Sequence, residues 1–216
     1  MSSKLGIKKQ FLQRREEKLN SASHGLGAFF AVVGMFALLS KNSEKTNFAT
    51  FGVLVYSFTL ITMFFVSSAY HATKNPKTKR VLRIVDHINI YFLIAGTYTP
   101  VALITLYYGN GWTIFYIVWS IAIAGTFFKL FYTGKLEFVS LLLYVAMGWL
   151  IVLDFDNLMN YTSYRGIWLL FLGGIFYTLG IFFYAFQRIQ YNHFIWHLFV
   201  LAGALCHWLF IYCEVV

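Results

Sequence analysis

The chain has 216 residues, of which 59% are hydrophobic, 21% are aromatic and only 12% are charged. A chain with so few polar residues cannot cover the surface of a soluble globular protein of this size. The composition therefore excludes soluble globular proteins and predicts an integral membrane protein. The net charge of +9 would favour nucleic-acid binding in a soluble protein. Here the basic residues stand between apolar stretches, where they set membrane topology, and we expect no nucleic-acid partner. The two cysteines, Cys206 and Cys213, lack a pairing or metal-binding pattern and are interpreted as small buried hydrophobic residues.

Residues 1–22 are polar and basic, and they lack the apolar core of a secretory signal, so we expect a short cytosolic tail. Seven apolar stretches that follow are long enough to cross the hydrocarbon layer. They lie near residues 23–40, 48–70, 85–107, 111–132, 136–153, 166–187 and 191–214. The sequence therefore predicts an all-α protein, a seven-transmembrane-helix bundle that forms one domain over residues 23–216.

Lysine and arginine residues are divided unequally between the two ends of these stretches. If the N-terminus is cytosolic, the tail and the inner loops carry 14 of them, and the outer loops carry only Lys41, Lys45 and Arg165. Cytosolic loops are the ones enriched in basic residues. We therefore predict a multi-pass protein of the cell (plasma) membrane with its N-terminus in the cytosol and its C-terminus outside.

The last apolar stretch begins with two histidines, His193 and His197, spaced four residues apart. On a helix they lie on one face, about 6 Å apart along the axis, a spacing that lets two imidazoles share one metal ion. The alternative is that they are ordinary interfacial aromatic residues. The predicted topology brings His71, at the end of the second stretch, to the same membrane depth. Polar residues at that depth usually face the bundle interior, so His71 is the candidate third ligand.

Two further residues near this depth are candidates for chemistry. Ser67 lies one turn before His71, where its hydroxyl can reach a substrate carbonyl; alternatively it bonds its own helix carbonyl, and Ser68 competes for the role. Asp86, at the start of the third stretch, can be a fourth ligand, a partner that orients a histidine, or a base. The alternatives for Asp86 are a helix cap or an ion pair with the basic residues at 79–83.

The other histidines are weaker candidates. His24 lies among small residues that favour close helix packing, and its ring is expected to bridge to a neighbouring helix. His87 points about 100° around the helix from Asp86. His207 lies about 15 Å beyond His197 along the helix, too far to share an ion, and is interpreted as a hydrogen-bonded core histidine.

Together these motifs span nearly the whole chain. They are Glu16-Glu17 with Asn20, Ser23-His24-Gly25-Leu26-Gly27, Ser67-Ser68-Ala69-Tyr70-His71, Asp86-His87, Ala95-Gly96-Thr97-Tyr98-Thr99-Pro100, and the pair His193 and His197. In order and spacing the chain resembles the haemolysin III proteins of bacteria. These belong to the progestin and adipoQ receptor family, which includes the adiponectin receptors and is more distantly similar to alkaline ceramidases.

The resemblance implies a bundle that holds Zn²⁺ near its cytosolic side through His71, His193 and His197. It also implies that Asp86 occupies the position of the family's aspartate, which holds the metal-bound water. Ser67 occupies the position of the family's serine, one turn before the first histidine ligand. Three imidazoles with an open position are typical of hydrolytic zinc sites. Because the site lies within the membrane, we predict a zinc-dependent hydrolase of a lipid amide or ester, linked to membrane lipid homeostasis, with the lipid bound inside the bundle. The relatives suggest ceramide, and the absence of a long regulatory domain argues against hormone binding.

Three other functions agree with parts of the pattern. A structural zinc would make the protein a non-enzymatic membrane sensor or regulator, and such a site needs neither Asp86 nor Ser67. A cytolytic protein agrees with the family name, but seven apolar spans cannot be secreted as a soluble monomer that later inserts. A zinc transporter needs ligands across the bilayer, and beyond the inner cluster the sequence offers only His207, Asp154 and Asp156.

Overall fold

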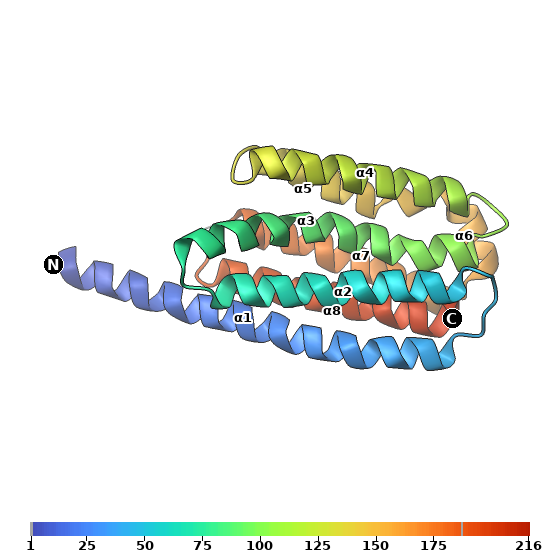
Figure 1. Ribbon diagram of the computed structural model, residues 1–216, viewed down its shortest axis with the longest axis horizontal. Coiled ribbons are helices and arrows are strands. Elements are labelled where there is room, and N and C mark those ends of the chain that lie inside the picture. Colours follow the sequence, from blue (N-terminus) through green and yellow to red (C-terminus); the bar gives the residue numbers. More distant parts are fainter. Residues whose placement is uncertain (1, 187) are drawn as a thin grey trace.

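A computed structural model describes residues 2–186 and 188–216, which form helices and connecting loops without a strand. Seven segments of this part are helical, long and apolar enough to cross a membrane, which confirms the predicted fold class (Figure 1). They are Gln10–Lys41, Ala49–Ala72, Pro76–Thr105, Gly111–Tyr132, Glu137–Tyr161, Tyr164–Ala185 and Asn192–Val215. The end predicted for the sixth span, residue 187, lies outside the described residues.

The helices are α1 (Ser2–Lys41), α2 (Ala49–Ala72), α3 (Pro76–Pro100), α4 (Gly111–Tyr132), α5 (Glu137–Gly148), α6 (Phe155–Tyr161), α7 (Tyr164–Ala185) and α8 (Asn192–Phe210). Short irregular helical turns extend three of them: Val101–Thr105 follows α3, Leu150–Asp154 joins α5 to α6, and Ile211–Val215 follows α8. The helix α1 begins beyond one end of the bundle, and the chain ends at the other (Figure 1).

Residues 2–22, expected as a tail, are helical and continuous with the first span. No proline interrupts residues 2–41, so the helix propagates through the polar segment without a break. The helix α1 packs against both α2 and α8. Its polar residues are thereby carried alongside the ends of two other helices, where they contribute to the site described below.

The third span begins at Pro76, and not near residue 85 as the apolar pattern predicted. The side chain of Asn75 accepts hydrogen bonds from the backbone N–H groups of Lys77 and Thr78, and Pro76 occupies the first helical turn, where its missing N–H costs nothing. The apolar pattern missed this start because the first turns of α3 are basic. Asp86 therefore lies inside the helix, and the alternative that it caps the helix is wrong.

Small residues bring α1 close to its neighbours, as the Ser23–Gly27 segment predicted. A Cβ atom on Gly27 would come within 2.7 Å of Leu201 Cδ2 on α8, and one on Gly25 within 3.1 Å of Ser68 Oγ on α2. Ser68 also donates a hydrogen bond of 2.8 Å to the carbonyl oxygen of Ser21. This region of α1 is therefore held against both α2 and α8.

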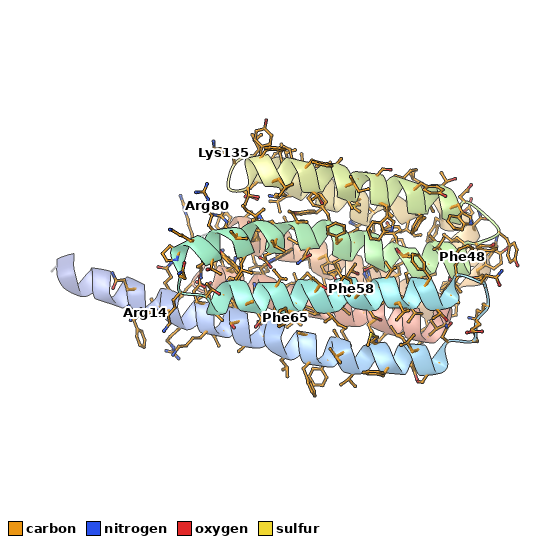
Figure 2. All side chains as sticks on the ribbon, in the orientation of Figure 1. Arg14, Phe48, Phe58, Phe65, Arg80 and Lys135 are labelled. Atoms are coloured by element: carbon orange, nitrogen blue, oxygen red, sulfur yellow. The ribbon has the colours of Figure 1, made fainter. Side chains whose placement is uncertain are left out.

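The outer surface of the bundle is apolar along its length. Phe58 and Phe65 of α2 are largely exposed (Figure 2). Such a surface suits lipid tails rather than water, as a multi-pass membrane protein requires. Arg14, Arg80 and Lys135 lie toward the same end of the bundle (Figure 2), which is the end that the lysine and arginine count predicts to be cytosolic.

Candidate metal centre

Three histidines meet at this basic end of the bundle. His71 comes from the last turn of α2, and His193 and His197 come from the first turns of α8. One ring nitrogen of each lies within 4.8 Å of the others. The ring centroids are 5.1 Å apart for His71 and His193, and 4.9 Å apart for each of the other two pairs. The structure thus brings together the three residues that the sequence proposed as ligands, in a cluster that can hold a metal ion.

Two nitrogens of this cluster lack a hydrogen-bond partner in the part of the chain that the structure describes. His71 Nε2 and His197 Nδ1 are buried and form no hydrogen bond with any described residue. Leaving a buried polar atom unsatisfied costs about 1–3 kcal/mol. A metal ion offers such nitrogens a partner, and imidazole suits zinc, copper, iron and nickel. The three histidines therefore fit a metal ion, because their unpaired nitrogens are suited to bind one.

Acidic residues of α1 support the cluster, a role that our sequence analysis missed. Glu17 Oε2 lies 3.2 Å from His71 Nδ1 and 2.5 Å from Lys79 Nζ. Because a carboxylate accepts, His71 Nδ1 carries the proton, and its Nε2 is left with the lone pair that metal binding needs. Glu16 Oε1 accepts a hydrogen bond of 3.1 Å from the backbone N–H of His193. The only signal was the Glu16-Glu17 pair itself, since no spacing rule connects residue 17 with residue 71.

Substituting Glu17 tests this support. We expect Glu17→Ala to weaken metal affinity about 10- to 100-fold, because His71 loses the partner that fixes its tautomer and ring orientation. Glu17→Gln keeps an oxygen that accepts from Nδ1 and should retain most of the affinity. The measurement is competition with a chromophoric zinc chelator in detergent. Equal affinities for wild type and Glu17→Ala would contradict the role, and matching thermal unfolding of the metal-free proteins would show that the variant is folded.

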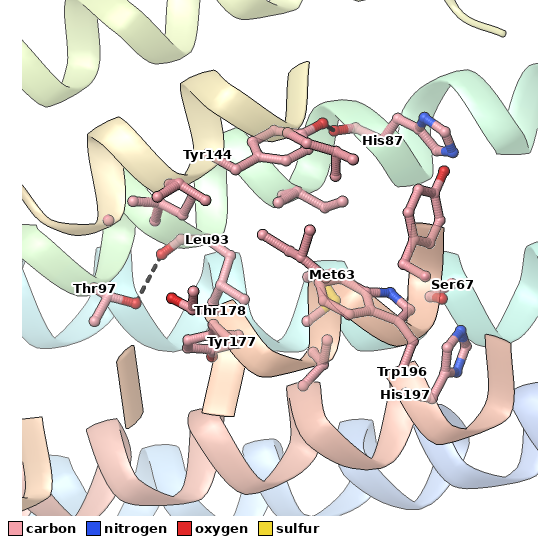
Figure 3. A pocket seen from close by; sticks show the side chains of 18 of the residues that line it. Met63, Ser67, His87, Leu93, Thr97, Tyr144, Tyr177, Thr178, Trp196 and His197 are labelled. Atoms are coloured by element: carbon pink, nitrogen blue, oxygen red, sulfur yellow. Dashed lines mark hydrogen bonds between the residues drawn. The ribbon is translucent and has the colours of Figure 1, made fainter. Parts of the chain in front are cut away.

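A cavity of about 130 Å³ lies beside the cluster (Figure 3). Ser67, Asp86, His193 and His197 are among its lining residues, and apolar side chains make up much of the remainder. Ser67 and His197 lie toward one end of it (Figure 3). Ser68, the competing serine, is instead bonded to α1 as described above. The hydroxyl and the carboxyl that the sequence selected therefore face the same space as two of the three histidines.

Asp86 forms no ion pair with any described residue, so the second structural alternative for it is not observed either. Within the basic segment, Lys79 pairs with Glu17, and Arg83 Nη2 lies 4.0 Å from Glu137 Oε1. Asp86 instead lines the cavity, together with Ser67. Its roles as a ligand, as an orienting partner or as a base remain compatible with this position.

His24 contacts α8, as the sequence suggested. Its ring stacks on His197 with centroids 3.7 Å apart and an interplanar angle of 15°, and its edge meets Phe64 at 5.1 Å. Both of its ring nitrogens are buried without a described partner. His24 does not join the cluster of three that can share an ion, and it holds the ring plane of one proposed ligand.

Glu137 organises a second group of charged side chains beside the cavity, which the sequence did not reveal. Its Oε2 accepts a hydrogen bond of 2.7 Å from Lys129 Nζ and lies 3.6 Å from His87 Nδ1. The Lys129 side chain is completely buried, so Glu137 supplies the counter-charge that burial demands. His87 and Glu137 also line the cavity, so His87 faces the same space as its neighbour Asp86.

The remaining candidates lie outside the cluster. His207 Nε2 is 3.1 Å from the carbonyl oxygen of Leu170, which agrees with its interpretation as a hydrogen-bonded histidine. Cys206 and Cys213 are free; Cys206 is buried and Cys213 is partly exposed. Neither cysteine belongs to the metal cluster found among the described residues.

Comparison with known proteins connects this arrangement to a family. The family model described as "Haemolysin-III related" matches residues 12–208. The chain is 38% identical to "Hemolysin-3" of Bacillus cereus over 205 residues, covering 94% of this chain and 93% of that protein. It is 36% identical to "Hemolysin-3 homolog" of Bacillus subtilis (strain 168), with 88% and 90% covered. It is also 30% identical to the human "Monocyte to macrophage differentiation factor", with 89% and 82% covered. The helical bundle, the matched residues and these relatives together show that the chain belongs to the haemolysin-III related family of membrane proteins.

Proposed function

We propose that this protein is a zinc-dependent hydrolase of the cell membrane that cleaves an amide or ester bond of a lipid. The observation that carries the proposal is the shared space at the inner end of the bundle. There, the histidine cluster, the Asp86 carboxyl, which pairs with no charged group in the described part of the chain, and the Ser67 hydroxyl adjoin an apolar cavity. A lipid amide or ester suits both parts of this space. Its carbonyl would lie beside the polar side chains, and its apolar chain would lie in the apolar cavity.

His71, His193 and His197 would hold the ion. Bound Zn²⁺ supplies Lewis acidity, which polarises a carbonyl and lowers the pKa of water toward ~7. Asp86 takes the proton that the attacking water releases and returns it to the leaving amine or alcohol as the C–N or C–O bond breaks. The Ser67 hydroxyl donates a hydrogen bond to the carbonyl oxygen, whose negative charge grows in the transition state.

The rest of the cavity binds the lipid chain and excludes water. Its apolar lining includes Met63, Leu93, Leu141, Val145, Ile181 and Val200. The lining comes partly from α5 and α7, which contact each other sparsely. A chain can therefore pass between these two helices from the bilayer, while the carbonyl stays near the basic end, at the depth of the inner headgroups. Membrane lipids are thus the expected partners.

A structural role for zinc is the second candidate, and one observation favours it. The cluster joins α2 to α8, and Glu17 and Glu16 connect α1 to the same two helices. An ion at this point would hold three helices together, as structural zinc does in small domains. Such a role gives no reason for Ser67 and Asp86 to face an apolar cavity, so we prefer the hydrolase.

The test is metal content and turnover measured on the same sample. Protein purified in detergent without added metal is analysed by inductively coupled plasma mass spectrometry, and then incubated with a panel of lipid amides and esters that differ in headgroup. One zinc per chain with release of a free fatty acid would support the hydrolase. One zinc with no release across the panel would favour the structural role, and absence of metal would exclude both.

A further inference from the structure

The cavity continues away from the metal cluster to a second polar region. A further cavity of about 40 Å³ adjoins the first. Six residues line both cavities, and we call them the junction: Thr97, Tyr98, Gly148, Trp149, Gly174 and His207. Figure 3 shows Thr97 and Thr178 at the end of the main cavity opposite Ser67 and His197. His207 lies ten residues after His197 on α8, which places it about 15 Å further along the helix axis.

The hydrogen-bond donors of the polar junction side chains are all used within the protein. Thr97 Oγ1 donates to the carbonyl oxygen of Leu93 at 2.8 Å (Figure 3). Tyr98 donates from its hydroxyl to a carbonyl at the end of α5 at 3.0 Å. Trp149 Nε1 donates to Thr178 Oγ1 at 3.2 Å. These side chains therefore present no free donor to a ligand, although a hydroxyl such as that of Thr97 can still accept.

The N–H donor of His207 is also used within the protein. Its Nε2 lies 3.1 Å from the carbonyl oxygen of Leu170, and a carbonyl only accepts, so Nε2 carries the proton. A neutral imidazole has one proton, which leaves Nδ1 as an acceptor. A Cβ on Gly173 would meet His207 at Cδ2 and Nε2, at 2.2 and 2.4 Å, so this edge of the ring faces α7 and Nδ1 lies on the opposite edge. Nδ1 forms no hydrogen bond with any described residue, and His207 lines both cavities.

We propose that the junction recognises a hydroxyl group on the lipid chain, and that His207 Nδ1 accepts its hydrogen bond. An apolar chain that runs from the metal cluster reaches the junction after about 15 Å, where a chain without a polar group would leave Nδ1 unpaired. A hydroxyl supplies the missing donor, whereas a ketone or an ether has only acceptors and would meet acceptors. This inference rests on the proposed function, because it specifies the substrate class as lipids with a hydroxyl in mid-chain.

The experiment measures binding alone, so it needs neither turnover nor a known substrate. Fatty acids of one chain length, each with a single hydroxyl at successive carbons, displace a fluorescent fatty acid from the detergent-purified protein. The unsubstituted acid and the matching ketones serve as controls. In the wild type we expect one narrow range of hydroxyl positions to bind about two- to tenfold more tightly than the unsubstituted acid, the size of one added hydrogen bond, and the ketones to gain nothing.

Variants then assign the preference to His207. His207→Phe keeps a ring of similar shape but offers no acceptor, and it should bind hydroxylated and unsubstituted acids equally. His207→Gln, whose amide can donate to Leu170 and accept from a ligand, should restore part of the preference. An equal preference in wild type and His207→Phe would overturn the proposal, as would a gain by the ketones or no preference at any position.

One further variant separates this inference from the proposed function. The double variant His193→Ala, His197→Ala removes two proposed metal ligands but leaves the junction intact. We expect it to bind hydroxylated and unsubstituted acids in the same ratio as the wild type does. If no hydrolysis is found for the wild type but the ratio persists, the hydrolase fails and the chain-binding site stands. If hydrolysis is found but hydroxylated and unsubstituted acids bind equally, the hydrolase stands and the hydroxyl-binding site fails.

Discussion

The double variant His193→Ala, His197→Ala should purify without zinc, whereas the wild type should carry about one ion per chain. Two of the three proposed ligands come from α8, and His71 alone could not hold an ion against a chelator. The consequence for stability is also measurable. At free zinc 100-fold above Kd, the wild type should gain about 2.7 kcal/mol of unfolding free energy, and the double variant should gain nothing.

The matched control is His207→Phe, which removes another partly buried histidine of the same helix but leaves the cluster whole. It should keep its zinc and the full gain in stability. Metal content by mass spectrometry and thermal unfolding with and without zinc measure both effects. A full equivalent of zinc in the double variant would exclude the site.

Asp86→Ala should retain most of the zinc and lose about 10²- to 10⁴-fold in lipid hydrolysis, the usual contribution of a positioned acid or base. The reason is the position of the carboxyl, which lines the cavity, forms no ion pair with described residues and does not belong to the histidine cluster. The measurement is release of fatty acid from the best substrate of the panel, beside the metal content of the same sample.

The control for this change is Asp156→Ala, because Asp156 is an exposed acid of α6, at the other end of the bundle (Figure 1). Its hydrolysis should match that of the wild type. Turnover by Asp86→Ala at the wild-type rate would remove Asp86 from the reaction and leave the structural role of zinc as the better account. Loss of both zinc and turnover would instead make Asp86 a ligand.

Two acidic residues, Glu17 and Glu137, make contacts between helices that the sequence could not predict. Glu17 supports His71 across 54 positions of sequence, and Glu137 neutralises Lys129 beside the cavity. Both contacts depend on how helices pack, because side chains on different helices meet at positions that no fixed spacing encodes. The basic first turns of α3 likewise hid its true start, since hydropathy measures fitness for lipid and does not measure helix length.

The sequence by itself determined the seven spans, the basic end of the bundle and the three histidines as a group. These follow from short-range chemistry: apolar length sets a span, and an i, i+4 pair sets a shared helix face. Only the tertiary structure decided that Asp86 is not a helix cap and forms no ion pair with the described residues. It also decided that Ser67 rather than Ser68 faces the cavity, and that His207 lies where two cavities join. Those outcomes depend on which side of each helix its neighbours cover, and burial by neighbouring helices is fixed when the bundle packs.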